Sequence, residues 1–521
     1  MKKRIPFGVW EPDSGAVGGL GRVTKAINVV PMKGGYKAIF GWNVAEGTTN
    51  TFTTTVITPT NVIGAYSAVQ GGATFSSVVD FVATTTAVYT LAETGATTPV
   101  VTGAAVTAPN INENFYFRDF TQYGREVIMT SGTNGSGTAP ICYYDIGSST
   151  VMTALGNEFQ SAFVTVLRDF VVFGRTYDGV DFSQPYRVRW SAFGDSHQYT
   201  PSAATQADYQ DLIQRFGKIQ RVLGGNDVFI ICEFGVVLME YVGGATIMRF
   251  TYLHEEVGTA HSASCVRVGD YCYFYSKRGF VRVGKAFGDV SYIGAGRVDR
   301  EFDFLLNDGN DATGTPNVRA YHDELNMGIG WQYGSDGRAI FYSYAADQWT
   351  LHGADGDRAD AYFLYASKIS YPSGGTPRFN SRLKTAAAIA TSGKLYAQND
   401  RDQKAKVKLA TGFEELSPGK KSVVDKVWPG QDIRGGAQTN PELVVTSIPK
   451  LNGVNLYAEP TSTYSSTASL QSDGLFTVTG PGSYEGRFHR FQLENSDTAS
   501  ERAGEQAILG IDVEFFERGN Y

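Results

Sequence analysis

Histidines are the side chains here with the widest chemical range, because they serve as metal ligands and as general acids or bases. They are His197, His254, His261, His322, His352 and His489. A zinc-protease motif places two histidines four positions apart around a glutamate. The run His254-Glu255-Glu256 has only the more distant His261 as a second histidine, and no histidine and cysteine spacing matches a zinc finger. The sequence therefore predicts no metal ligands.

Two aspartate-rich runs and one glycine run have the composition of ligand loops. Residues 308–311 (DGND) and 355–360 (DGDRAD) are similar to calcium loops but lack the spaced bidentate glutamate. We expect exposed turns there, with adventitious cation binding as the alternative. Residues 18–21 (GGLG) lack the Lys-Ser/Thr of a phosphate loop and follow no strand. We expect an ordinary flexible loop rather than a nucleotide site.

Nucleophile and glycosidase signatures are nearly absent. No Gly-x-Ser-x-Gly elbow occurs. Sialidase-type propellers repeat a Ser-x-Asp-x-Gly-x-Thr-Trp turn, and only residues 472–477 (SDGLFT) are loosely similar, once. Paired carboxylates from distant parts of the chain are a remaining route to glycoside cleavage. The prediction is a protein that is not an enzyme, with no catalytic or cofactor-binding residues and no cofactor.

Charge and cysteine content limit the class of protein. The net charge of −7 argues against a sequence-reading nucleic-acid binder, which normally has a concentrated basic face. Four cysteines in 521 residues are too few for a disulfide scaffold, and all lie in apolar, strand-like runs. We expect buried thiols in a reducing compartment. These are Cys142, Cys232, Cys265 and Cys272.

Export and membrane signals are also missing from the sequence. The basic start at Met1 is followed by Pro6 and by Trp10-Glu11-Pro12-Asp13 instead of an apolar core. No window offers the ~18 apolar residues of a membrane helix. We expect a chain without a signal peptide or a transmembrane segment, made in the cytosol.

The elements that would position these residues are short strands. Sixty glycines, 13 % aromatic residues and abundant Thr, Ser and Val are typical of many strands joined by tight turns. A unit recurs in which an acidic residue directly precedes an apolar strand, followed by a turn and a second strand. Its acidic residues are Asp80, Glu126, Asp169, Asp227, Asp270 and Glu324, with a looser copy near Gly393.

The spacing of these copies, 43 to 58 residues, matches the blades of a β-propeller. We expect the acidic residue at the turn between strands, where it caps backbone N–H groups or accepts a hydrogen bond from a neighbouring unit. The alternative is an unrelated series of β-sandwiches. Our prediction is an all-β fold, with a β-propeller built from antiparallel hairpin units and a C-terminal antiparallel sandwich.

Changes of composition suggest four parts of the chain. Residues 1–43 are predicted to be an N-terminal arm with a closing strand, and residues 44–76 a Thr/Gly-rich insert or an extension of the first blade. The propeller is predicted over 77–404, up to a charge-dense linker. Residues 405–521 contain alternating strands and are predicted to form the C-terminal β-rich domain.

One long motif, residues 186–212 (YRVRWSAFGDSHQYTPSAATQADYQDL), combines a strand with a polar tail. Alternation places Arg187 and Arg189 on one face of the strand and Val188 and Trp190 on the other. Because the tail leads to the next copy of the repeat, we predict a crossover between blades that supports the propeller or a neighbouring subunit.

This motif and six others resemble, in order, the tail nozzle (tail hub) proteins of short-tailed bacteriophages, which are also called packaged-DNA stabilisation proteins. The other matching segments are residues 6–13 (PFGVWEPD), 26–42 (AINVVPMKGGYKAIFGW), 266–283 (VRVGDYCYFYSKRGFVRV), 293–306 (IGAGRVDREFDFLL), 486–495 (GRFHRFQLEN) and 508–515 (ILGIDVEF). The resemblance covers most of the chain, and it departs at 44–76 and 411–440.

The resemblance implies a propeller with attached β-domains, assembled as a six-copy ring below the portal and its head-to-tail adaptor. The ring would prolong the channel that retains the end of the packaged DNA, and would offer surfaces to tailspikes or fibres and to a plug or needle. Duplex DNA would pass without sequence-specific binding, so we expect a channel surface that is net negative or neutral. A tail glycan hydrolase and a non-catalytic receptor-binding module are the alternatives.

Overall fold

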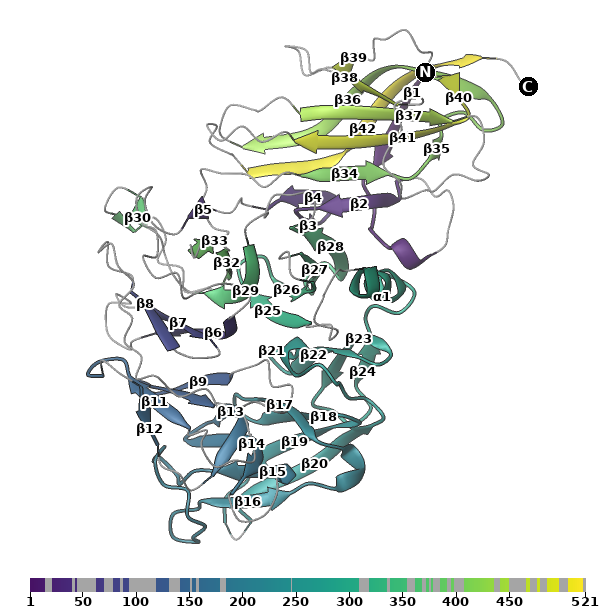
Figure 1. The fold of residues 1–521 in the computed structure, drawn as a ribbon. Helices are drawn as coiled ribbons and strands as arrows, with labels where there is room; N and C mark the ends of the chain where they lie inside the picture. Colours follow the sequence, from purple (N-terminus) through teal and green to yellow (C-terminus); the bar gives the residue numbers. More distant parts are fainter. Residues whose placement is uncertain are drawn as a thin grey trace.

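The computed structural model describes most of the chain in two regions, a propeller and a sandwich that lie at opposite ends of an elongated molecule (Figure 1). The residues described are 1–14, 21–39, 43–44, 62–69, 78–84, 88–92, 119–130, 141–149, 152–155, 159–178, 184–244, 246–308, 318–334, 338–353, 361–367, 372–373, 376–377, 385–390, 395–397, 407–434, 441–448, 465–468, 476–477, 485–495 and 505–518.

Seven antiparallel sheets, counted over the described residues, form the propeller and are numbered here as blades 1 to 7. Their innermost strands contact one another in order around a ring, except that blades 4 and 5 meet through the 3-10 turn at residues 262–264, and blade 7 lies against blade 1. The predicted β-propeller is therefore confirmed by the strand pairing.

The strands of blades 1 to 4 are β6 (Val62–Val69), β7 (Val78–Thr84) and β8 (Val88–Ala92); β9 (Asp119–Tyr123), β10 (Glu126–Thr130), β11 (Cys142–Asp145) and β12 (Thr153–Ala154); β13 (Gln160–Leu167), β14 (Phe170–Tyr177), β15 (Gln184–Trp190) and β16 (Asp208–Asp211); and β17 (Ile219–Leu223), β18 (Val228–Cys232), β19 (Gly235–Tyr241) and β20 (Met248–Glu255).

The strands of blades 5 to 7 are β21 (Val266–Val268), β22 (Tyr271–Ser276), β23 (Gly279–Gly284) and β24 (Val290–Tyr292); β25 (Arg319–Asp323), β26 (Gly328–Gln332), β27 (Ala339–Ser343) and β28 (Gln348–His352); and β29 (Ala361–Ser367), β32 (Thr385–Ala390), β33 (Leu395–Ala397) and β5 (Asn43–Val44). A small hairpin of β30 (Pro372–Ser373) and β31 (Thr376–Pro377) lies between β29 and β32 in the sequence.

Strands covered by neighbouring blades are apolar on both faces. In blade 4 every residue of β18 is buried, as expected for a strand covered by blades on both sides. Neighbouring sheets pack closely where a glycine allows it. A Cβ at Gly174 of β14 would lie 2.7 Å from a methyl group of Val222 in β17.

The segment 44–76 contributes to the first blade, which agrees with the predicted alternative of a first-blade extension rather than an insert. β6 supplies the innermost strand of blade 1 from within this segment, and β5 pairs with β33 as the outermost strand of blade 7. Composition left both alternatives open because the threonine- and glycine-rich residues around β6 are not typical of a strand.

The sandwich is built from two sheets. One contains β1 (Lys2–Pro6), β3 (Val29–Met32), β4 (Gly35–Ala38), β36 (Lys421–Arg434), β39 (Phe476–Thr477), β40 (Glu485–Gly486) and β42 (Glu505–Arg518). The other contains β2 (Val23–Ile27), β34 (Lys408–Thr411), β35 (Glu414–Glu415), β37 (Pro441–Ile448), β38 (Ser465–Ala468) and β41 (Phe488–Asn495), and continues into blade 6 through β2 and β28. The predicted C-terminal sandwich thus takes four strands from the N-terminal segment.

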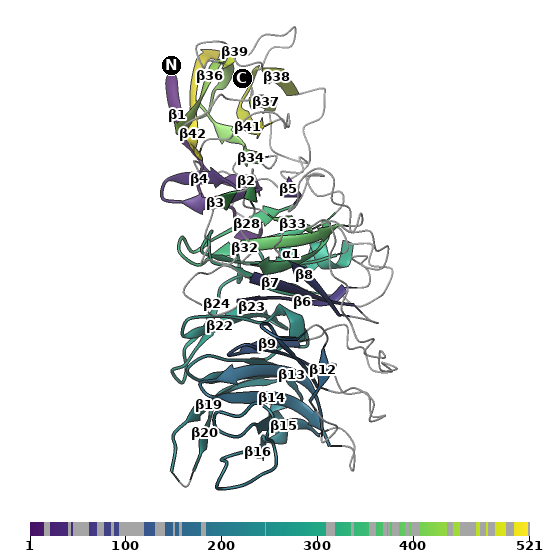
Figure 2. The ribbon, with the colours of Figure 1, turned by 90° about the vertical axis from the view of Figure 1, so that its left-hand side faces the viewer.

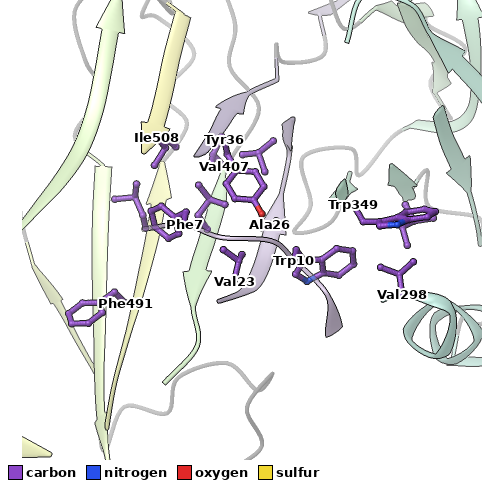
Figure 3. Close-up of a cluster of buried hydrophobic side chains, with 14 of the residues drawn as sticks. Phe7, Trp10, Val23, Ala26, Tyr36, Val298, Trp349, Val407, Phe491 and Ile508 are labelled. Carbon is purple, nitrogen blue, oxygen red and sulfur yellow. The ribbon is translucent and has the colours of Figure 1, made fainter. Parts of the chain in front are cut away.

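A single hydrophobic core runs from the sandwich into blades 5 and 6 (Figure 3). Phe7 and Ile508 lie on the sandwich side, while Trp10 lies towards Trp349 of blade 6 and Val298. All five side chains are buried. Burial of such large apolar groups stabilises the junction, so the N-terminal segment holds the two regions together.

Helix α1 (Asp299–Asp308) is the α-helix of the described residues, and it lies beside this junction (Figure 1). Its N-terminus is capped from far away in sequence. The Asp13 carboxylate, in the 3-10 turn η1 (Pro12–Ser14), accepts hydrogen bonds from the backbone N–H groups of Arg300 (2.6 Å) and Glu301 (2.9 Å). The side chain of Arg297 forms an ion pair with Glu11 at 2.9 Å. The arm is thereby attached to the segment between blades 5 and 6.

Among the described residues, no helix is long and apolar enough to cross a membrane.

Candidate functional site

The histidines considered as metal ligands lie apart. His254 is on β20 and stacks on Phe287, with 6.1 Å between ring centroids, whereas His261 precedes the 3-10 turn η4 (Ser262–Ser264) and lies 5.6 Å from the ring of Tyr275. Burial lowers the pKa of His254 below its ordinary value. Within the described part of the chain, no three His, Cys, Asp or Glu side chains are placed to hold a metal ion.

The other loop candidates lie mostly outside the described residues. Of the runs 18–21, 308–311, 355–360 and 472–477, the structure describes only Gly21, Asp308 and Phe476–Thr477. No ligand geometry is therefore assigned to them.

The four cysteines form no disulfide and are buried, which confirms the expected burial of the thiols. Burial raises the pKa of Cys232 and Cys265 to about 12. A thiol with so high a pKa stays protonated at neutral pH and is a poor nucleophile.

A serine and histidine group that the sequence did not indicate lies inside the sandwich. His489 of β41 contacts Ser422 of β36 (Nε2 to Oγ, 2.7 Å) and Ser447 of β37 (Nδ1 to Oγ, 2.8 Å). All three residues are buried, and burial lowers the pKa of His489 to about 4, so the ring is neutral at pH 7. The hydrogen bonds of this group join three strands. Three segments far apart in sequence contribute it, which is why no motif revealed it.

The acidic residues of the repeat lie at the predicted turns in five of the six copies. Glu126, Asp169, Asp227, Asp270 and Glu324 each sit at or beside the turn between the first and second strands of a blade. The sixth prediction was wrong. Asp80 is buried within β7, because that strand already begins two residues earlier at Val78.

Two of these carboxylates join neighbouring blades. Glu126 of blade 2 accepts hydrogen bonds from Ser196 and contacts His197 at 2.9 Å, both in the loop of blade 3. Asp227 of blade 4 forms an ion pair with Arg267 of blade 5 at 2.7 Å and another with Lys285 at 2.7 Å. The expected bond from a neighbouring unit is confirmed at these two positions.

A buried ion pair connects three innermost strands. Asp119 of β9 and Arg221 of β17 are 3.0 Å apart, and the other Asp119 oxygen accepts the N–H of Val164 on β13 at 3.1 Å. Burial raises the pKa of Asp119, against the opposing effect of the Arg221 charge. One carboxylate thus fixes blades 2, 3 and 4 relative to one another.

The motif at 186–212 is not a crossover between blades. Its two ends form β15 and β16, which pair as the third and fourth strands of blade 3 (Arg187 opposite Asp211), and residues 191–207 are the loop between them. The prediction was wrong because the end of the polar tail, β16, pairs with β15 as the edge strand of the same blade. The tail is polar although the strand that it pairs with contains the buried Trp190. Val188 and Trp190 are buried whereas Arg187 and Arg189 are only half-buried, which agrees with the expected alternation, and the loop does support the propeller through its contact with Glu126.

The sides of the propeller differ in the turns that they carry. In a four-stranded antiparallel blade, the turns between strands one and two and between strands three and four lie on one side, called face 1 here. The turns between strands two and three, and the connections to the next blade, lie on the opposite side, called face 2.

Face 1 exposes apolar side chains on three successive blades. Phe193, Val242 and Phe287 lie in the turns between the third and fourth strands of blades 3, 4 and 5, and Phe287 is 83 % exposed. Phe193 stacks on Tyr241 of the next blade, with 6.5 Å between centroids. Exposed large apolar side chains that lie close together are typical of binding surfaces. Among the described residues, this surface therefore has the character of a contact site.

The comparisons with known proteins concern the fold. The sequence matches no family model and no curated protein. The chain is similar to the solved structure titled "Streptogramin B lyase structure" (11 % identity, TM-score 0.38, covering 69 % of this chain and 97 % of that one). It is also similar to the β-propeller domain of Myceliophteria thermophila Cps50 (Swd1) (7 % identity, TM-score 0.28, 69 % and 100 % covered) and to Kluyvelomyces marxianus Hsv2 (8 % identity, TM-score 0.30, 56 % and 74 % covered). Because these TM-scores are low, the propeller assignment depends on the strand pairing of this chain.

Proposed function

We propose that this chain is a structural protein of the tail of a short-tailed bacteriophage, the nozzle or tail hub. In this proposal it forms a ring of six copies that prolongs the portal and adaptor channel. The ring retains the end of the packaged DNA and lets it pass on ejection. It also carries the tailspikes or fibres and the plug or needle.

The observation that carries the proposal is the position of the motifs that resemble that family. Residues 6–13 and 26–39 hold the sandwich to the propeller, with Trp10 in the shared core and Asp13 on helix α1. The motif 186–212 joins blades 2, 3 and 4. The resemblance therefore resides in residues that connect the sandwich to the propeller and neighbouring blades to one another, which supports a structural role.

The charge of the chain supports passage of DNA without retention. Every lysine or arginine that neutralises a phosphate strengthens binding and releases counterions. A chain with a net charge of −7 is suited to a channel that repels duplex DNA weakly. In the proposed ring, the channel surface is net negative or neutral. A lumen lined continuously by arginine and lysine would contradict this part of the proposal.

Electron microscopy of the purified chain mixed with a purified phage connector (portal with adaptor) tests the proposal. We expect a sixfold ring docked beneath the connector. Free chains at high concentration, with every candidate connector, would contradict the nozzle function. Binding of isolated chains to host cells, or carboxylate-dependent cleavage of host polysaccharide, would favour the receptor-binding or hydrolase alternative.

A further inference from the structure

The N-terminal arm meets the propeller at a group of carboxylates. The Asp13 carboxylate accepts the N–H groups of Arg300 and Glu301, and the Asp13 N–H donates to the Arg297 carbonyl at 3.0 Å. Asp299 directly precedes the two N–H groups that Asp13 holds, and the charge of Asp13 acts on its carboxylate. Two carboxylates from distant parts of the chain therefore share the first turn of helix α1.

The Asp299 carboxylate is enclosed by backbone. One of its oxygens accepts the N–H of Phe280 in β23 at 3.0 Å. A Cβ at Gly279 or at Gly294 would collide with this carboxylate, so glycine at both positions leaves room for it. A carboxylate in such a position has lost much of its water, and a single N–H donor replaces only part of that hydration.

These charges are not balanced by ion pairs within the described part of the chain. Neither Asp299 nor Glu301 forms one with another described residue. The guanidinium group of Arg297 binds Glu11 at 2.9 Å and Asp347 at 3.0 Å. The other charged groups of the elements packed here contact different partners or are exposed: Arg22 on the Glu11 carbonyl, Lys277 on the Phe234 ring, Arg278 on Glu256, Asp303 on the Tyr275 hydroxyl, and the exposed Arg300.

Neighbouring carboxylates that are partly out of water disfavour the ionised form. Burial, with the charges of Asp13 and Asp303 adding to it, raises the pKa of Asp299 from 3.8 to about 6, although the Phe280 N–H opposes this shift. Burial and the Asp13 charge raise the pKa of Glu301 as well. Asp299 is therefore ionised beside Asp13 at pH 7 and mostly protonated at pH 5, where its carbonyl oxygen can still accept the Phe280 N–H.

We propose that the contact between the N-terminal arm and helix α1 is a proton-operated latch, in which uptake of one proton by Asp299 removes its repulsion with Asp13 and tightens the arm on the propeller. The arm also contributes Trp10 to the junction core, so the latch holds the sandwich to the propeller more firmly in mild acid. The latch is a property of the single chain and goes beyond the proposed function, on which it does not depend.

The direction of the effect follows from proton linkage. The closed latch binds the proton of Asp299 more tightly than the opened one, so this contribution is complete below pH 3.8 and is lost as the pH rises through 6. His489 has the opposite effect on the sandwich, because burial lowers its pKa and the unfolded chain binds its proton more tightly. The two opposite signs separate a local latch from a general effect of acid.

Hydrogen exchange of the full chain between pH 7 and 5, corrected for intrinsic rates, tests the latch. We expect the protection of the Arg300 and Glu301 amides to rise by about tenfold towards pH 5, while that of the β41 amides falls. In Asp299→Asn the protection should be high at both pH values and nearly constant. Asp169→Asn, at an exposed carboxylate of blade 3, is the matched control and should show the natural rise.

Constant or falling protection of the Arg300 and Glu301 amides in the natural protein would overturn the latch, and so would an equal rise in Asp299→Asn. A parallel rise in β41 would overturn it too, because acid would then act on the whole chain. If Asp299→Asn does not fold, Asp13→Asn decides, since it keeps an acceptor oxygen but removes the neighbouring charge. The rise should be smaller in that variant, and an unreduced rise would overturn the repulsion between the two carboxylates.

Discussion

At the scale of single residues, the most informative side chains are buried polar ones, since each must find a partner inside the fold. His489 lies between two serines, and Asp119 lies against Arg221. Neither pair belongs to a sequence motif, and neither reaches solvent as a reactive group. Their effect is on stability, and two predictions follow from their charges.

The sandwich is expected to lose stability on mild acidification because of His489. Its pKa is lowered to about 4 from the ordinary 6.5, so the unfolded chain takes up the proton first. The contribution is fully present above pH 6.5 and falls between pH 6.5 and 4, by roughly 3 kcal/mol. Hydrogen exchange of the β41 amides, measured from pH 7 to 4.5 and corrected for intrinsic rates, reports this loss locally.

His489→Gln is the control, because an amide hydrogen-bonds to serine but does not titrate. In that variant the protection of β41 should be lower at pH 7 and should change less between pH 6.5 and 4. Equal pH dependence in the two proteins would show that another group is responsible.

Breaking the ion pair between Asp119 and Arg221 should strongly destabilise the propeller. Arg221→Met leaves a buried carboxylate without its cation, which costs about 3 kcal/mol or more. The double variant Asp119→Asn with Arg221→Met should recover part of the loss, because the amide oxygen still accepts the Val164 N–H. Denaturant unfolding of the natural protein, the two single variants Arg221→Met and Asp119→Asn, and the double variant measures both effects. If the two single losses add up to the loss of the double variant, the side chains are not coupled.

At the scale of elements, the sequence predicted the repeated hairpin units but not which strands pair with one another. Acidic residues at turns and alternating apolar strands recur locally, so the propeller and most turn positions were predicted correctly. The loop between β15 and β16 looked like a link to the next blade, because a single chain gives no sign of which strand a tail will pair with. For a similar reason the sequence left the segment around β6 open between an insert and an extension of the first blade, since its partner β7 supplies the pattern that its own surroundings lack.

Helix α1 depends on a cap from the N-terminal arm. Asp13→Ala removes the acceptor for the N–H groups of Arg300 and Glu301, and we expect a cost of about 1–2 kcal/mol. Hydrogen exchange of the first turn of α1 should rise more than tenfold. Asp13→Asn keeps an acceptor oxygen and should retain most of the protection; a change as large as that of alanine would assign the effect to charge alone.

At the scale of the whole molecule, the junction core decides whether the propeller and the sandwich behave as one unit. Trp10 is buried in that core, and its indole N–H donates to the Thr24 carbonyl at 3.2 Å. The sequence predicted only that this tryptophan belongs to the N-terminal arm, residues 1–43. Its burial depends on residues of blade 6 and the sandwich that no local pattern connects to it.

Trp10→Ala should lower the stability by about 3–5 kcal/mol and uncouple the two regions. Calorimetry is expected to show one transition in the natural protein and two separated transitions in the variant. Tyr209→Ala, which removes an exposed aromatic side chain far from the junction, is the comparison and should leave a single transition. A single, merely shifted transition for Trp10→Ala would contradict the coupling role.

The pairing of β1 with β42 has a consequence for the order of events during synthesis. Residues 2–6 leave the ribosome early, yet their partners are residues 510–514, and β5 likewise waits for residues 396–397. Such distant pairings form late and slowly, because the intervening chain must first be ordered. Chains that stop before residue 510 therefore lack the strand that receives β1. Both pairs therefore close their sheets only after the later strand, β33 or β42, has been made.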